Sequence, residues 1–554
     1  MRRDVLRSSL ENVYFSIVFQ ILCRVLTFGI NAFIVRKVGR DVLGVMNVRL
    51  LLLESTLLFL SREAITRASL SATTQKLSKC TWPQLVNQIW LTVPICAGLA
   101  GPCLYVWLEV LSPVGEDLYS QYKFGCFAVA LSCVIELSAE MPVFVAQIYC
   151  FVKFKIFIDT LHIFVRSFIF IWIVLRNRQI AIIAFGIAQL SSALTIVAGH
   201  YIFIYYYIQK ERKLKFGKSV KNKHLDKIDM DHDGTFPFTE IKQLIPGFSQ
   251  SKDKAFNSEL QILTLSFVKQ SILKQILNEG EKYVMSVSPV LSFSQQATYD
   301  VVNNLGSLAA RFIFRPIEDN SYFYFTQSVS RDVALLDQNK EKITECAKVL
   351  KAICKTVTSI GLMAFIFGQS YSGPVLLLYG GADFVAGGQA EQLLRWHSLA
   401  VCFLAINGIT EGYMFATNTS KDIDKYNYYM AIFSFLFLAL SYIFTIFFGP
   451  VGFILANCTN MFLRICYSVT FIHKQFRPVQ LYPLDGLRPG KLFVSTLLIM
   501  GVVSKASEIY FSSTSVFKHL AIGILCVSFT LLSWIFENRD LVQILYANYK
   551  HKLK

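Results

Sequence analysis

Charged residues are scarce in this chain. Asp, Glu, Lys and Arg together make up 16% of its 554 residues, whereas hydrophobic residues make up 54% and phenylalanine alone occurs 47 times. A soluble protein of this length would carry considerably more charge, so the composition excludes that class. It is typical of a protein whose surroundings are largely lipid.

Several motifs for catalysis and energy coupling are also missing. No G-x-x-x-x-G-K-[ST] run occurs, so the sequence contains no P-loop for ATP. The 13 cysteines form no C-x-x-C pair, and the 8 histidines show no H-x-x-x-H or H-E-x-x-H spacing. We interpret both residue types as structural, and the sequence predicts no cofactor.

Long apolar windows dominate the chain instead. About fourteen windows of roughly 20 mainly apolar residues recur along it, each long enough to span a bilayer. The first contains Arg24 and Asn31 and is too long for a cleavable signal peptide, so we expect it to remain as a membrane helix. The sequence thus predicts an all-α polytopic membrane protein. The windows lie near residues 13–35, 41–60, 86–110, 124–148, 151–175, 181–208, 262–290, 295–326, 346–368, 390–416, 425–447, 450–471, 491–511 and 517–536.

Lysine and arginine gather before the first window and after even-numbered windows. The residues from 210 to 223 are rich in them, and only Arg176 and Arg178 clearly break the pattern. The positive-inside rule therefore predicts that both termini are cytosolic. The net charge of +17 lies mostly on that face, which we interpret as a topology signal rather than a nucleic-acid site.

One long polar segment divides the chain. We expect an N-terminal six-helix lobe over 1–208, a cytosolic linker over 209–261, a second six-helix lobe over 262–474, and two terminal helices with a cytosolic tail over 475–554. Because each lobe starts from the cytosol, the two could be parallel repeats around a central cavity, as in a transporter.

Ionisable residues inside the windows are the functional signal. An arginine at the bilayer centre costs about 2.5–3.5 kcal/mol on insertion scales, so each needs a partner, a wet cavity or a function. The seventh and eighth windows are too polar to face lipid, and we expect them and the first two windows to line a wet cavity. Arginine forks suit phosphate oxygens, which favours an anionic amphiphile such as a lipid-linked diphosphate. Alternatively, Arg and Glu pair with each other and brace the helices.

Long blocks of the chain resemble the eukaryotic Rft family. They are NAFIVRKVG, GVMNVRL, LFLSREA, FVKQSILKQILNEGEKYVM, YDVVNNLGSLAARFIFRPIE, AINGITEGYMFA and VGFILANCTNM. The resemblance implies a fold of two six-helix lobes plus two helices, in the superfamily of multidrug, oligosaccharidyl-lipid and polysaccharide flippases. It also implies a protein of the endoplasmic-reticulum membrane that serves N-glycosylation. Its substrate would be the diphosphodolichol-linked heptasaccharide of five mannoses and two N-acetylglucosamines, moved from the cytosolic to the luminal leaflet.

Within the matching blocks we expect eight residues to form the substrate site. The diphosphate and headgroup contacts are assigned to Arg36, Arg62, Arg311 and Arg464, with Lys269, Glu63, Glu279 and Asn304 as the next tier. The expected mechanism is alternating access without ATP, driven by luminal consumption of the product or by an ion gradient. Other proteins of the glycosylation pathway are expected partners.

Residues 229–240, DMDHDGTFPFTE, match an EF-hand calcium loop. Asp229, Asp231, Asp233 and Glu240 occupy ligand positions. The flanking sequences make poor helices, however, and no second hand is present. We favour a solvated linker that matches by chance, with a weak regulatory calcium site as the alternative.

Three other functions remain open. A non-transporting scaffold would need the same binding residues but not two alternating states. An ion-coupled exporter of small organic cations is disfavoured by the arginines, and an intramembrane transferase lacks a catalytic motif beside a long non-cytosolic loop. The ending KHKLK places Lys550 and Lys552 in a dilysine-type retrieval pattern, which agrees with the reticulum.

Overall fold

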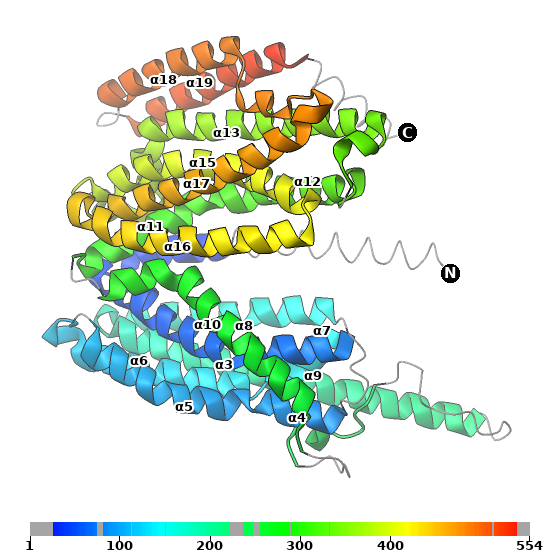
Figure 1. The fold of residues 1–554 in the computed structure, drawn as a ribbon. Coiled ribbons are helices and arrows are strands. Elements are labelled where there is room, and N and C mark those ends of the chain that lie inside the picture. The colour runs from blue at the N-terminus through cyan, green and yellow to red at the C-terminus, as the bar shows by residue number, and fades with distance from the viewer. Residues whose placement is uncertain are drawn as a thin grey trace. The chain divides into compact units, whose positions relative to one another are not determined.

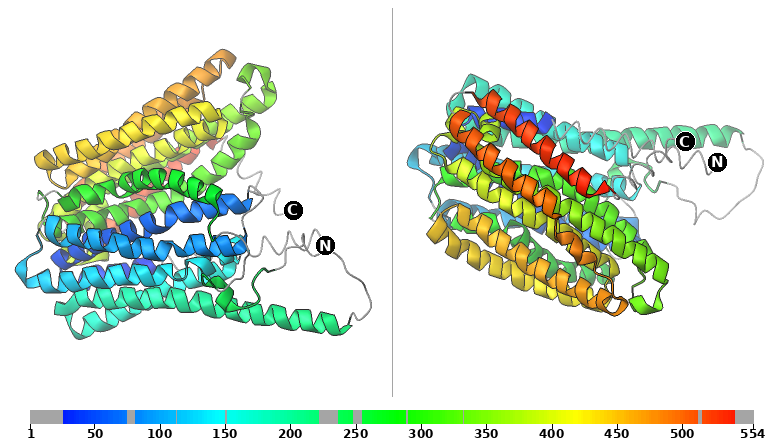
Figure 2. Two further views of the ribbon diagram at one scale, coloured as in Figure 1. Left: turned by 60° about the horizontal axis from the view of Figure 1, so that its bottom comes forward. Right: turned by 90° about the horizontal axis from the view of Figure 1, so that it is seen from above.

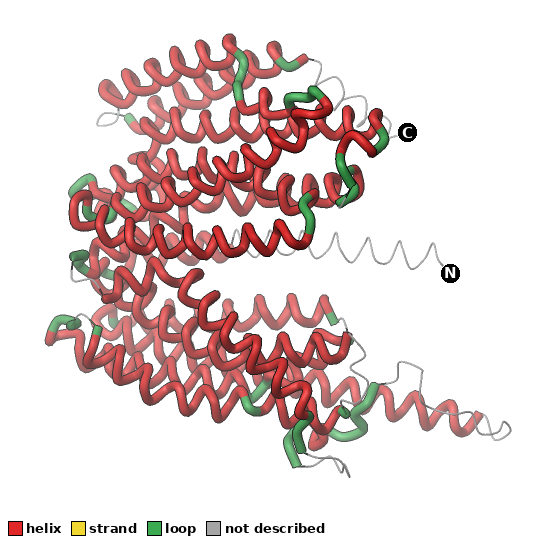
Figure 3. The backbone as a smooth tube through the Cα atoms, in the orientation of Figure 1, coloured by secondary structure: helices red, strands yellow, loops and turns green. Residues whose placement is uncertain are grey.

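The part of the chain that the structure describes consists of helices joined by loops (Figure 3). The computed structural model describes residues 26–74, 81–111, 113–149, 151–221, 236–247, 255–287, 290–331, 333–511 and 515–539. These residues form helices and short turns and contain no strand, which confirms the all-α class.

The chain divides into two compact units, Met1–Val287 and Ser288–Lys554. The hydropathy pattern assigned the seventh window to the second lobe, whereas the contacts of the corresponding helix place it in the first unit. The terminal helix pair belongs to the second unit. The division into two six-helix lobes stays a prediction.

The first unit consists of long helices interrupted by short π and 3-10 turns. Residues 26–37 are helical, and the following helices and turns are α2 (Arg40–Gly44), η1 (Val45–Leu50), α3 (Leu51–Thr74), α4 (Trp82–Trp90), α5 (Thr92–Tyr105), η2 (Val106–Val110), α6 (Glu116–Leu137), α7 (Glu140–Ile148), α8 (Val152–Arg176), η3 (Arg178–Ile180), α9 (Ala181–Lys221), η4 (Ile241–Leu244) and α10 (Ser258–Val287).

Helix α3 lies at the centre of the first unit. It packs against α5, α6 and α10, while α9 packs on both α6 and α8 (Figure 1). At 1.5 Å per residue, the 41 residues of α9 extend about 62 Å, twice the thickness of a bilayer core. Its C-terminal part therefore projects beyond the helices beside it (Figure 2).

The end of the polar linker packs firmly on the first unit. Phe236, Phe238 and Leu244 are buried, and the ring of Phe238 meets that of Trp82 at 5.3 Å. The indole nitrogen of Trp90 donates a 2.7 Å hydrogen bond to the carbonyl oxygen of Leu244. This segment is therefore a strap across α4 and its neighbours, although composition alone indicated a solvated linker.

The second unit begins with one interrupted helix and ends with a helix pair. Its helices and turns are α11 (Phe293–Ala309), η5 (Ala310–Phe314), α12 (Arg315–Ser328), η6 (Leu335–Asp337), α13 (Lys340–Gly380), α14 (Ala382–Val385), α15 (Gln389–Thr417), α16 (Ser420–Phe448), α17 (Val451–Phe476), η7 (Arg477–Val479), η8 (Pro483–Leu487), α18 (Lys491–Phe511) and α19 (Val516–Glu537).

Local sequence fixes where several of these helices start and stop. The side-chain oxygen of Asn339 accepts hydrogen bonds from the first backbone amides of α13, and Thr419 caps α16 in the same way. Gly449, with φ of 59°, ends α16, and Pro450 leads into α17. Because only two residues join them, α16 and α17 run antiparallel and side by side (Figure 2).

Helix α15 forms the core of the second unit. It packs against α11, α12, α13 and α17, and the rings of Phe325, Tyr413 and Phe476 meet in the buried cluster between them. The terminal pair α18 and α19 packs on α13 (Figure 1). There the buried ring of His519 stacks on Tyr371 with 4.3 Å between centroids.

Ten helical segments of the described chain are long and apolar enough to cross a membrane. The other expected windows correspond to residues 26–37, α10, the α11–η5–α12 run and α17, which fall short of that criterion over the residues described. Helix α10, with 30 residues, is about 45 Å long and so could still span a bilayer. The total of fourteen stays a prediction.

We predict that the strap contributes to stability through Leu244. Replacing this fully buried side chain by alanine should destabilise the protein by about 2–5 kcal/mol, because the cavity left behind is only partly filled. The melting temperature in detergent and the rate of proteolysis within residues 236–247 measure this. Lys242→Ala, at an exposed position in the same turn, is the control. If Leu244→Ala and Lys242→Ala melted at the same temperature, the prediction that the buried Leu244 side chain stabilises the protein would be wrong.

Candidate functional site

Helices α3 and α10 share a polar interface in the first unit. Glu63 accepts a 2.9 Å contact from the ammonium group of Lys274, and Ser55 donates a 3.0 Å hydrogen bond to Glu279. Residue numbers fall along α10 as they rise along α3, so the two helices are antiparallel. The interface brings two of the predicted residues, Glu63 and Glu279, onto the same helix pair.

Each of these carboxylates also has a basic neighbour on its own helix. Arg67, one turn along α3, contacts Glu63 at 2.7 Å, and Lys282 contacts Glu279 at 3.0 Å. Three charges of the seventh window, those of Lys274, Glu279 and Lys282, are thus paired inside the unit. This arrangement supports the bracing interpretation for both glutamates.

Arg62, also on α3, contacts α6 rather than α10. Its guanidinium lies 3.3 Å from Glu136 of α6, and one turn later Thr66 donates a 3.0 Å hydrogen bond to Glu140 of α7. The Arg62 side chain remains 42% exposed. Since arginine has five N–H donors and this contact uses one nitrogen, Arg62 keeps donors available for an anion.

Arg36 and Lys269 occupy exposed positions in the first unit. Arg36 lies at the end of the helical residues 26–37, and Lys269 lies near the middle of α10. The contact of Arg62 described above is with Glu136 and not with either of these side chains.

Arg311 and Asn304 do come together in the second unit. The guanidinium of Arg311, in the π-helical turn η5, donates to Asn304 at 3.1 Å and to Ser307 at 2.6 Å. The amide of Asn304 in turn donates to Asp300 at 3.4 Å. Arg311 and Asn304 are both exposed, and the partners of Arg311 in these two bonds are neutral. Its positive charge therefore remains available to an anionic ligand.

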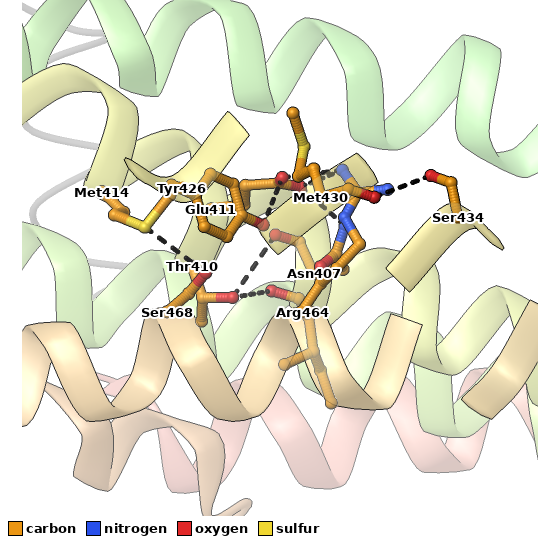
Figure 4. A network of polar contacts seen from close by, with 10 residues as sticks. Asn407, Thr410, Glu411, Met414, Tyr426, Met430, Ser434, Arg464 and Ser468 are labelled. Atoms are coloured by element: carbon orange, nitrogen blue, oxygen red, sulfur yellow. Dashed lines mark hydrogen bonds and ion pairs between the residues drawn. The ribbon is translucent and has the colours of Figure 1, made fainter. Parts of the chain in front are cut away.

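Arg464 is held in a buried network between α15, α16 and α17 (Figure 4). One terminal nitrogen of Arg464 contacts both carboxylate oxygens of Glu411, at 2.7 and 2.5 Å. The same carboxylate accepts hydrogen bonds from Tyr426 at 2.7 Å and from Asn407 at 2.9 Å. With four contacts on one carboxylate, this network is a brace between three helices.

Sequence reasoning missed the partner of Arg464. Glu411 is 53 residues away in sequence, and we assigned it no role. The sequence does contain a feature that could have identified Glu411. Asn407 and Glu411 are two polar residues four positions apart in an apolar window, so both lie on one helix face. A second cluster was missed as well, in which Arg395 joins Glu391 to Glu508 of α18 at 2.5 Å each.

The calcium-like loop is only partly within the described residues. Asp229, Asp231 and Asp233 lie outside them. Glu240 forms a 3.2 Å ion pair with Arg212 and precedes the four-residue turn η4, where an EF-hand would have a longer helix. No group of three His, Cys, Asp or Glu side chains suited to a metal ion occurs among the residues that the structure describes. Calcium binding stays an untested prediction.

Comparisons with known proteins match nearly the whole chain. A family model described as Rft protein matches residues 8–548. The Man(5)GlcNAc(2)-PP-dolichol translocation protein RFT1 of Drosophila melanogaster is 60% identical and covers 100% of both chains. The protein of the same name from Xenopus tropicalis is 37% identical over 99% of this chain and 98% of its own.

A solved structure shares the fold. The lipid II flippase MurJ in its inward closed conformation matches with a TM-score of 0.61 and 14% identity, covering 96% of this chain and 100% of its own. This likeness confirms the all-α polytopic fold class.

We predict that Glu411 and Arg464 act as one structural unit. Glu411→Leu or Arg464→Met alone should destabilise the protein by about 2–4 kcal/mol, because each leaves the other charge uncompensated in a largely buried site. The double variant should recover most of that loss, since apolar side chains replace both members of the pair.

Melting temperatures in detergent measure this double-mutant cycle. Asp424→Asn, at an exposed position on α16, is the control and should have little effect. Losses that simply add in the double variant would show that the two side chains stabilise the fold independently.

Proposed function

This chain belongs to the Rft protein family, and on that premise we propose that it moves a diphosphodolichol-linked heptasaccharide across the endoplasmic-reticulum membrane. The lipid carries five mannoses and two N-acetylglucosamines and passes from the cytosolic to the luminal leaflet. The protein is a transporter rather than an enzyme. The observation that carries this proposal is the 60% identity, over the full length of both chains, to a relative named for translocating this lipid.

The available arginines support an anionic headgroup. Arg62 is partly exposed with one contacted carboxylate, and Arg311 is exposed with neutral hydrogen-bond partners. A guanidinium fork binds phosphate oxygens in a bidentate manner, so these two side chains suit a diphosphate. We assign them the primary headgroup contacts, with Arg36 and Lys269 as further exposed cations.

Arg464 and the two glutamates receive a different role. Because Arg464 is held by the buried carboxylate of Glu411, and Glu63 and Glu279 are paired with Lys274 and Lys282, we assign these predicted site residues to bracing the helices. Asn304 then orients Arg311 through the 3.1 Å hydrogen bond between them.

The transport step that we propose is alternating access. The headgroup binds from the cytosolic leaflet, a conformational change opens its site to the lumen, and the dolichol chain remains in lipid. The sequence contains no P-loop, so ATP has no part in this proposal. Direction comes from luminal consumption of the product by other proteins of the pathway, or from an ion gradient. Both termini lie in the cytosol, as the positive-inside rule predicts.

We predict that transport depends on Arg62 and Arg311. Sealed vesicles containing purified protein and the labelled heptasaccharide lipid are exposed to an external sugar-binding probe, which reports transbilayer exchange. Arg62→Ala and Arg311→Ala should each slow exchange about 10- to 100-fold, because each removes charge-assisted hydrogen bonds to the diphosphate.

Arg488→Ala removes an exposed arginine outside the proposed site and should exchange like wild type. Lipid binding that depends on Arg62 and Arg311 without any exchange would replace the transporter by a glycolipid-binding scaffold. Absence of binding in folded wild-type protein would reject the proposed substrate.

A further inference from the structure

A groove of about 460 Å³ lies between α16 and α17 of the second unit. This volume is within the usual range for a small-molecule site, roughly 300–1,000 Å³. Aromatic and aliphatic side chains form most of its lining, and two lysines complete it. None of the eight residues that the sequence assigned to substrate lines the groove.

The two lysines lie at the same end of the helix pair. Lys425 is in the second turn of α16, and Lys474 is two residues before the end of α17. Both are exposed, and no Asp or Glu occurs among the described residues that line the groove. Asp422, one turn away, accepts a 2.8 Å hydrogen bond from the hydroxyl of Thr419 at the start of the helix. The groove therefore has a positive end.

The apolar lining extends from that end toward the middle of both helices. Phe433 is eight residues beyond Lys425, and Leu463 is eleven residues before Lys474, which corresponds to about 12 and 16 Å along the helices. Residues Asp422–Phe448 form one of the membrane-spanning candidates. The lysines thus lie near the membrane surface, and the apolar wall lies at the depth of the acyl chains.

Tyr429 and Tyr467 line the groove and belong to a cluster of tyrosine rings in tilted contact. The ring of Tyr467 lies 4.8 Å from that of Tyr426 and 5.6 Å from that of Tyr429. Tyr426 is fully buried and donates its hydroxyl to Glu411 in the brace with Arg464. Tyr467 therefore rests on the buried network, so that little ordering of this side chain is required when a ligand binds.

We propose that this groove binds an anionic glycerophospholipid of the surrounding bilayer. The phosphate lies between Lys425 and Lys474, and one acyl chain lies along Tyr429, Phe433 and Leu463. Lysine binds phosphate as a compact point charge, and basic pockets between membrane helices are typical sites for such headgroups. A seven-sugar headgroup is too large for this volume, which favours a bilayer phospholipid over the transported lipid.

The test uses purified, delipidated full-length protein titrated with phosphatidylinositol and observed by native mass spectrometry. The wild-type protein should retain one phosphatidylinositol molecule more tightly than any further phosphatidylinositol molecules that bind to it. Lys425→Gln with Lys474→Gln should weaken that lipid about fivefold for each lysine removed. The control is Lys340→Gln with Lys342→Gln, which removes two exposed lysines at the start of α13 and should leave binding unchanged.

A phosphatidylinositol with a photoactivatable acyl chain locates the site in wild-type protein. Crosslinks at α16 and α17 support the proposal even if the double variant does not fold. Equal weakening in the control pair, or crosslinks confined to other helices, would overturn it. Occupancy of the groove by dolichyl diphosphate but not by phosphatidylinositol would assign it to the transported lipid and likewise reject the proposal.

Discussion

Ion pairing inside helix interfaces is the constraint on which this structure depends. A charge facing hydrocarbon costs several kcal/mol, so a helix rich in charge is stable in a membrane only beside complementary helices. In the first unit, α3 satisfies this condition by holding α10 through Glu63 and Lys274 and α6 through Arg62 and Glu136. In the second unit, Arg464 and Glu411 hold α17 to α15. The polar windows and the helix packing are therefore two consequences of one requirement.

The same requirement separates the cations into two groups. Arg464 contacts both oxygens of a carboxylate that is 8% exposed, so drawing it away would leave that charge buried. The side chain of Arg62 is 42% exposed, Arg311 is also exposed, and both keep donor capacity. A transporter must release what it binds, and accessible cations with modest internal partners suit that cycle better than a cation fixed in a brace.

The brace and the lipid groove share one helix pair. Tyr426 joins them, since its hydroxyl contacts Glu411 and its ring packs against Tyr467 of the groove. A phospholipid between Lys425 and Lys474 would therefore rest on two helices that the network of Arg464, Glu411 and Tyr426 holds together. Such a lipid would support a helix pair whose outer faces carry large exposed apolar side chains such as Phe435 and Phe447.

The sequence by itself determined the all-α membrane class, the positions of most helices, the family, and the fact that charged residues lie within the windows. Periodicity and composition carry that information, because each apolar window is long enough to form its helix locally. The tertiary structure decided which charges meet: Lys274 reaches Glu63 across 211 residues, and Arg464 reaches Glu411 across 53. It also placed α10 in the first unit and folded Phe236 and Leu244 into a strap. These outcomes depend on how helices rotate and pack against distant neighbours, which no local pattern specifies.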